Sequence, residues 1–88
     1  MSRGWTVYIL RCADGTLYTG STNDVARRIT AHNDGRGARY TRSRRPVRLR
    51  FLHRVRGRSA ALRKEALIKR LPRLEKRRLL SDGEIRIP

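Results

Sequence analysis

Residues 7 to 20 read VYILRCADGTLYTG, and this stretch decides the fold. Two short apolar runs flank a turn that contains Asp14-Gly15. β-Branched and aromatic residues on both sides of an Asp-Gly turn are typical of a β-hairpin, so the sequence predicts strands over 5–11 and 16–21. Each run carries one tyrosine, and the register of the hairpin decides whether the two phenols share a face.

The length of the turn sets this register. A two-residue turn at Asp14-Gly15 would put Tyr8 and Tyr18 on opposite faces of the sheet. A three-residue loop, with glycine in the left-handed position, pairs Tyr8 with Gly20 and puts both phenols on one face. We favour the three-residue loop. The opposite face is then the more apolar one and is expected to pack on a helix; it consists of Val7, Ile9, Leu17 and Thr19.

A helix is predicted over 24–33, with Asp24 in its first turn. Val25 and Ile29 stand one turn apart and should face the core. Arg28 and His32 form a second four-residue ladder beside them, and spacing alone favours a solvated pair. The candidates for the N-cap are Ser21, Thr22 and Asn23.

An arginine-rich segment follows over 36–45 and is expected to form a long mobile loop. Its only aromatic residue, Tyr40, could stack on a base or a guanidinium group, or anchor the loop on the domain. Alternation then predicts a third strand with one apolar and one basic face. The apolar face would hold Val47, Leu49, Phe51 and Val55, and the basic face Arg48, Arg50 and Arg54.

Two further helices are predicted, over about 59–71 and from Pro72 to about Leu80. The buried positions of the first are expected to be Ala61, Leu62, Ile68 and Leu71. The predicted fold class is α/β, of the α+β type: a three-stranded antiparallel sheet flanked by about three helices in the order β-β-α-β-α-α. We expect a single domain over 1–83 and a short tail over 84–88. Cys12 has no cysteine partner and is expected to be a small buried residue.

Charge points to a polyanionic partner. The 88 residues contain 23 Lys+Arg, of which 20 are arginine, against 7 Asp+Glu, which leaves a net charge of +16. Nucleic acid, DNA or RNA, is the expected partner of such a field, and a membrane surface is disfavoured because no basic amphipathic helix has a large apolar face. No apolar run is long enough to span a membrane and no signal peptide is evident, which predicts a soluble intracellular protein.

Few residues could support phosphodiester chemistry, which needs charge stabilisation and usually a hard cation held by oxygen ligands. Between Asp34 and Glu75 the only carboxylate is Glu65, and it falls within the apolar arc of its helix. A carboxylate on the core side needs a cationic partner. Spacing leaves two alternatives open: an ion pair with Lys69, one turn on, or a metal ligand.

Together these motifs resemble the GIY-YIG nuclease domain. The resemblance rests on VYIL, LYTG, STNDVARRITAH and ALRKEALIK, and it spans about residues 5–80. It is closest to the small single-domain bacterial members, which carry a similar G-x-x-A-R-Y-T-R loop. The resemblance implies a metal-dependent endonuclease that acts on DNA or RNA with low sequence specificity, in the bacterial cytoplasm or nucleoid.

The resemblance also implies roles for particular residues. Tyr8 would be the general base or would activate the attacking water, Tyr18 would support it by hydrogen bonding, and Arg28 would contact the scissile phosphate. Glu65 would hold one Mg²⁺ or Mn²⁺, and His32 matches a helix histidine of many members. Nucleic-acid contacts are expected from Gly20, Ser21, Arg27, Arg39, Tyr40, Arg42, Arg44 and Arg45.

The sequence departs from the family pattern at two positions. Thr6-Val7-Tyr8 keeps the tyrosine of the first motif but lacks its glycine, and Ser21 stands where some repair nucleases have lysine. Two rival functions therefore stay open: a basic nucleic-acid-binding module with the same fold but no turnover, and a small ribosome-associated protein, favoured by charge alone.

Overall fold

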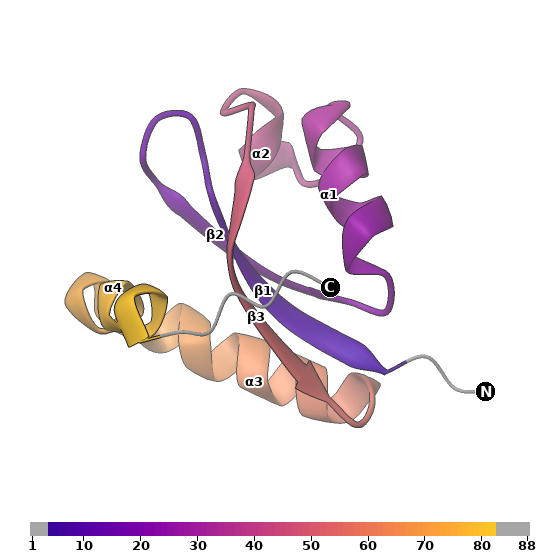
Figure 1. The fold of residues 1–88 in the computed structure, drawn as a ribbon, viewed down its shortest axis with the longest axis vertical. Helices are drawn as coiled ribbons and strands as arrows, with labels where there is room; N and C mark the ends of the chain where they lie inside the picture. Colours follow the sequence, from indigo (N-terminus) through magenta and orange to yellow (C-terminus); the bar gives the residue numbers. More distant parts are fainter. Residues whose placement is uncertain (1–3, 83–88) are drawn as a thin grey trace.

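The computed structural model describes residues 4–82 and confirms the predicted fold class and element order. A three-stranded antiparallel sheet, in the order β2-β1-β3, lies between α1 and α2 on one face and α3 and α4 on the other (Figure 1). The short helical turn α2 is an addition to the prediction, and the predicted tail over 84–88 lies outside the described residues. The elements are β1 Trp5–Arg11, β2 Leu17–Thr22, α1 Val25–Asn33, α2 Arg39–Arg42, β3 Arg48–Val55, α3 Arg58–Arg70 and α4 Arg73–Asp82.

The hairpin has the register of the three-residue loop. The N–H of Cys12 donates to the carbonyl oxygen of Thr16 at 2.8 Å, and Gly15 adopts a φ of 84°, the left-handed conformation that the loop requires. Tyr8 consequently pairs with Gly20 across the strands. Leu10 pairs with Tyr18, so the two tyrosines share one face of the sheet as predicted.

Both faces of the sheet are covered, and the molecule has two small cores. The core on the α3 and α4 side contains Val7, Ile9, Phe51, Ala61 and Ile68, with Leu79 and Leu80 packed against it. The core on the α1 side contains Tyr8, Leu10, Cys12 and Val47, with Val25, Ile29 and Leu49 packed against it. The expectation that Leu62 is buried was wrong, because 49% of its surface is exposed.

The predicted division of β3 into one apolar and one basic face was also wrong. Ile9 pairs with Phe51 but the next residue, Leu10, pairs with Leu49, so Arg50 is an extra residue in a β-bulge. The bulge reverses the alternation of side chains. Leu49 therefore packs on the tyrosine side while Phe51 packs on the α3 side, although their spacing in a regular strand would put them on one face.

The segment expected to be a mobile loop is instead held on the hairpin. Its α2 turn precedes Arg44, whose carbonyl oxygen accepts the N–H of Ala13 at 2.9 Å and whose guanidinium pairs with Asp14 at 3.0 Å. The guanidinium of Arg45 donates to the carbonyl oxygen of Asn33 at 3.2 Å. These contacts join 36–45 to the end of α1 and to the tip of the hairpin.

The N-cap of α1 is Asp24 rather than one of the three preceding residues. Its carboxylate accepts the N–H of Arg27 at 3.2 Å, while the Thr22 hydroxyl accepts the N–H of Asp24 at 3.1 Å. Within residues 4–82, no helix is long and apolar enough to cross a membrane.

Candidate active site at the edge of the sheet

Gly20 allows the phenol of Tyr8 to lie across β2. A Cβ atom at position 20 would stand 2.5 Å from the hydroxyl oxygen of Tyr8 and 2.7 Å from its Cζ. The space above Gly20 is filled by the ring of Tyr8, which is 1% exposed. Glycine is therefore needed here to bring the hydroxyl of Tyr8 to the β2 edge.

His32 is buried beside this hydroxyl, so the expectation of a solvated helix residue was wrong. Its Nε2 lies 3.0 Å from the Tyr8 oxygen, and its Nδ1 lies 2.7 Å from Oγ1 of Thr41. The backbone N–H of Ala38 also donates to Nδ1, at 3.4 Å. The Thr41 hydroxyl itself donates to the carbonyl oxygen of Ala38 at 3.0 Å, so Thr41 and Ala38 together hold the ring of His32 in place beside Tyr8.

Thr41 is a site residue that sequence reasoning missed. It is fully buried and belongs to α2, within the segment that was expected to be mobile. Nothing in its spacing distinguishes it from the exposed polar residues beside it. Its contact with His32 arises only because α2 folds back on α1.

An aromatic row extends from His32 toward α2. The rings of Tyr18 and His32 meet edge to face, with centroids 5.2 Å apart, and Tyr18 stacks on Tyr40 at 6.0 Å. The guanidinium carbon of Arg44 lies 4.0 Å from the centroid of Tyr40. Tyr40 therefore anchors its segment on the domain and stacks on a guanidinium group, two of the roles considered from the sequence.

Four of the predicted site residues interact electrostatically: Tyr18, Arg28 and Glu65 all affect the phenol of Tyr8. Burial raises the pKa of Tyr8 to about 12, against the opposing effect of the Arg28 guanidinium, while Tyr18 and Glu65 raise it further. These three residues come from β2, α1 and α3, and all act on one phenol. At neutral pH Tyr8 is thus a protonated phenol, and Arg28 alone does not make it a base.

Glu65 lies between a hydroxyl and a cation. Its Oε1 accepts the Ser21 hydroxyl at 2.6 Å, and its Oε2 pairs with Nζ of Lys69 at 2.8 Å. The carboxylate raises the pKa of Lys69 by accepting this hydrogen bond, which confirms the ion pair that spacing suggested. Of the two alternatives considered for Glu65, the cationic partner is thus present.

A divalent ion fits this site only with help from a ligand. In residues 4–82 no group of three or more His, Cys, Asp or Glu side chains could enclose a metal. Glu65 alone would supply one carboxylate, and the side chain is 19% exposed at the edge of the sheet. Because Mg²⁺ keeps several waters and often binds together with phosphate oxygens, the donor set fits an ion that arrives with a nucleic acid.

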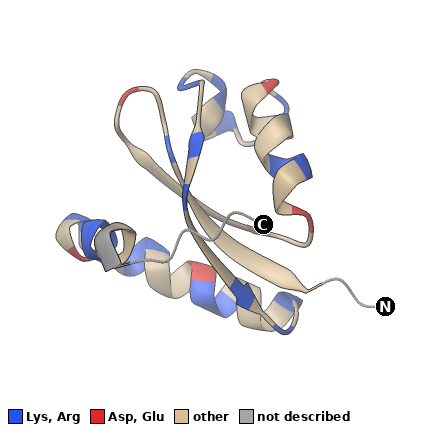
Figure 2. Cartoon of the chain, in the orientation of Figure 1, with Lys and Arg blue, Asp and Glu red and all other residues tan. Residues whose placement is uncertain are grey.

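The arginines among the candidate nucleic-acid contacts fall into two groups. Arg27, Arg39 and Arg42 have exposed side chains on α1 and α2, where they could meet phosphates. Arg44 and Arg45 instead hold their own segment in place through Asp14 and Asn33. Figure 2 shows lysine and arginine on every helix and on β3, so the basic surface is not confined to one face.

Acid should destabilise the fold through His32. Burial lowers the pKa of His32, and the Arg28 charge lowers it further. The unfolded chain, in which histidine has a pKa of about 6.5, binds this proton more readily than the folded chain does, so the free energy of unfolding should fall as the pH drops below that value. We expect a slope of up to about 1.4 kcal/mol per pH unit in urea titrations between about pH 6.5 and pH 5.

The His32→Gln variant should lose most of that slope. The matched control is His53→Gln, which replaces an exposed histidine of β3 and should keep it. An equally steep decline in both variants would contradict the assignment of the effect to His32.

Comparisons with known proteins point to one family. The sequence profile of the GIY-YIG catalytic domain matches residues 4–78. A UPF0213 protein of Desulfotalea psychrophila is 56% identical over 81 residues, covering 91% of this chain and 74% of the relative. A UPF0213 protein of Natronomonas pharaonis is 51% identical over 76 residues, covering 86% and 89%.

Solved structures agree with this placement. A UPF0213 protein from Bacillus halodurans, determined in solution by NMR, is 46% identical, covers 89% of this chain and 83% of its own, and superposes with a TM-score of 0.58. A protein from E. faecalis, also solved by NMR, is 37% identical over 92% of this chain and 86% of its own, with a TM-score of 0.62. The names of these relatives state no activity, substrate or partner.

Proposed function

The chain belongs to the GIY-YIG family, and on this premise we propose that it is a divalent-metal-dependent nuclease that hydrolyses phosphodiester bonds of DNA or RNA with low sequence specificity. One observation carries the proposal: Tyr18, Arg28 and Glu65, from three different elements, all act electrostatically on the buried phenol of Tyr8. Ionisable groups gathered around one strongly shifted pKa are typical of catalytic sites.

In this proposal Tyr8 is the general base. The resting phenol must first lose its proton to solvent, and the resulting phenolate would then take a proton from the attacking water. The phenolate oxygen would accept a hydrogen bond from the Arg28 guanidinium, which favours its charged form. His32 acts as a positioning residue that contacts the Tyr8 oxygen, and Thr41 and Ala38 hold its ring in place.

Arg28 and Glu65 would act on different charges, Arg28 on the phosphate and Glu65 on a metal ion. Arg28 would stabilise the negative charge that develops on the phosphate. Glu65 would hold one Mg²⁺ or Mn²⁺, which when bound lowers the pKa of nearby oxygen groups and polarises the phosphate. Lys69 would have to release one carboxylate oxygen for this, since it occupies that oxygen in the absence of nucleic acid.

The second candidate function is a nucleic-acid-binding module without turnover. The Glu65–Lys69 ion pair favours it, because Lys69 already supplies a positive charge where the ion would sit. The raised pKa of Tyr8 also favours it, because a protonated phenol does not accept a proton from water.

A cleavage assay separates the two functions. Purified protein is incubated with end-labelled single-stranded, duplex and branched DNA, and with RNA, in Mg²⁺, in Mn²⁺ and in EDTA. We expect metal-dependent cleavage of at least one substrate, without a fixed sequence at the cut. Salt-dependent binding to every substrate with no cleavage in either metal would overturn the nuclease and favour the binding module.

A further inference from the structure

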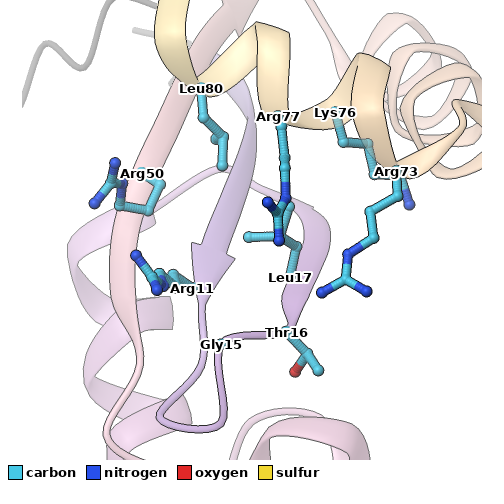
Figure 3. Close-up of a pocket in the computed structure, with 9 residues that line it drawn as sticks. All are labelled: Arg11, Gly15, Thr16, Leu17, Arg50, Arg73, Lys76, Arg77 and Leu80. Carbon is cyan, nitrogen blue, oxygen red and sulfur yellow. The ribbon is translucent and has the colours of Figure 1, made fainter.

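A basic cavity lies on the opposite face of the sheet from the two tyrosines. Its volume is about 460 Å³, and it is enclosed by α4, the ends of β1 and β2 and the bulge of β3 (Figure 3). Pockets that hold small ligands usually measure about 300–1,000 Å³, so this cavity could admit a nucleotide. Five of its lining side chains are cationic, namely Arg11, Arg50, Arg73, Lys76 and Arg77.

The charge in this cavity is of one sign. Among the described residues that line it, none is acidic. The nearest acidic residues in sequence have other partners: Asp14 pairs with Arg44, and Glu75 of α4 pairs with Arg78 at 3.8 Å. Cations gathered in a concavity repel one another and concentrate the positive field, and a bound anion relieves that repulsion.

Arg50 adds an unsatisfied donor at the wall of the cavity. Its Nε atom is buried and has no hydrogen-bond partner among the described residues. The β-bulge is what brings this side chain to the α4 side, as the pairing of Ile9 with Phe51 and of Leu10 with Leu49 leaves Arg50 between them. Buried donors without a partner are rare, and the Arg50 side chain that carries this one is part of the cavity lining.

The cavity continues toward the candidate active site. It shares Leu17 and Lys76 with a second hollow of about 200 Å³. That hollow is lined by Tyr18, Tyr40 and Lys69, the last of which is the ion-pair partner of Glu65. A chain of phosphates could therefore pass from the tyrosines over the β2 edge to α4 and meet cations throughout.

We propose that the α4 cavity is a second phosphate-binding subsite, which holds the nucleic-acid strand on one side of the bond to be cut. The inference rests on the proposed function for its substrate class. Phosphate contacts give affinity without reading sequence, so the subsite would hold the strand in the active site without specifying its sequence.

Binding is measured in EDTA, so that it does not depend on cleavage. Fluorescence anisotropy follows labelled oligothymidylates of about 5 and about 20 nucleotides, which lie near the lower end and above the upper end of the range of about 4–16 nucleotides for a single-strand site. The cavity variant is Arg73→Gln/Lys76→Gln. The matched control, Arg56→Gln/Arg58→Gln, also removes two cations, both exposed, next to the Val55 end of β3. The cavity lies toward the other end of that strand, where Arg48 pairs with Arg11.

We expect the cavity variant to bind the long oligonucleotide about tenfold more weakly than the control variant does. Its plot of log affinity against log salt should be shallower by about 1.4, the value for two lost contacts to single-stranded phosphates. The two variants should differ little in binding the short oligonucleotide. Equal affinities and equal salt slopes for the long oligonucleotide would overturn the subsite.

The source of the phosphate is tested by amide NMR. Signals of Gly15 and Thr16, which line the cavity, should shift with the long oligonucleotide at far lower phosphate concentration than with adenosine monophosphate. Saturation by the mononucleotide at equal or lower concentration would overturn the strand assignment and indicate a small-molecule site. Binding that depends on the cavity in a protein that never cleaves would support the subsite while contradicting the nuclease.

Discussion

The Tyr8→Phe variant is expected to keep its fold and its affinity for nucleic acid while losing cleavage by about a hundredfold to ten-thousandfold, the range for removal of a general base. Phenylalanine preserves the ring that packs over Gly20 and against His32. Only the hydroxyl group, which contacts Nε2 of His32 and interacts with the Arg28 guanidinium, is removed. The measurement is the single-turnover cleavage rate at saturating nucleic acid, with binding measured separately.

The control is Tyr40→Phe, at a tyrosine whose ring stacks on Tyr18 but lies outside the group that acts on Tyr8. It should cleave at nearly the wild-type rate. The Tyr8→Phe variant should also unfold more easily, by about 1–3 kcal/mol, because Nε2 of His32 loses its hydrogen-bond partner in a buried site. Wild-type cleavage by Tyr8→Phe would remove Tyr8 from the mechanism.

The hairpin could be predicted because its information is local. Asp14-Gly15 specified the turn, and counting residues from Gly15 set which side chains pair. The bulge at Arg50 could not be predicted in the same way. The bulge leaves no mark on the alternation of apolar and basic residues in the sequence of β3. It becomes visible only when the pairing with the partner strand is known.

The site residues can also be separated into those that the sequence indicated and those that depend on contacts between elements. The resemblance implied Tyr8, Tyr18, Arg28 and Glu65, and in the structure the last three lie within electrostatic range of Tyr8. The burial of His32 depends on contacts that its own helix does not supply, with Tyr8 of β1, 24 residues before it, and with Thr41 of α2, 9 residues after it. A histidine on a helix carries no local signal of such contacts, and Thr41, inside an irregular segment, carries still less.

Glu65 illustrates a case in which local information stated the alternatives without choosing between them. Its spacing to Lys69 predicted the ion pair, and its place in the apolar arc indicated that the carboxylate would be partly buried. The contact with Ser21 comes from β2 and could not be read from the helix. This contact also ties α3 to β2, the edge strand that lies beside the strand carrying Tyr8.

Replacement of Glu65 by glutamine should reduce cleavage by about a thousandfold, which corresponds to several kcal/mol of lost metal assistance. Glutamine keeps the size of the side chain and can still accept the Ser21 hydroxyl, so the fold should be preserved. Affinity for nucleic acid should stay the same or increase, because one negative charge is removed. The control is Glu75→Gln, at an exposed carboxylate of α4, which should cleave normally.

Lys69→Gln tests the same site in the opposite direction. If Lys69 competes with the ion for Oε2, its removal should lower the Mg²⁺ or Mn²⁺ concentration that gives half-maximal cleavage. The Glu65→Gln/Lys69→Gln double variant should show no such gain, because the carboxylate on which it depends is gone. If Lys69 instead takes the place of the ion, Lys69→Gln would weaken binding and leave no metal-dependent cleavage. That outcome would support the binding module, because Lys69 would then supply the positive charge of the site permanently and would not give way to a metal ion.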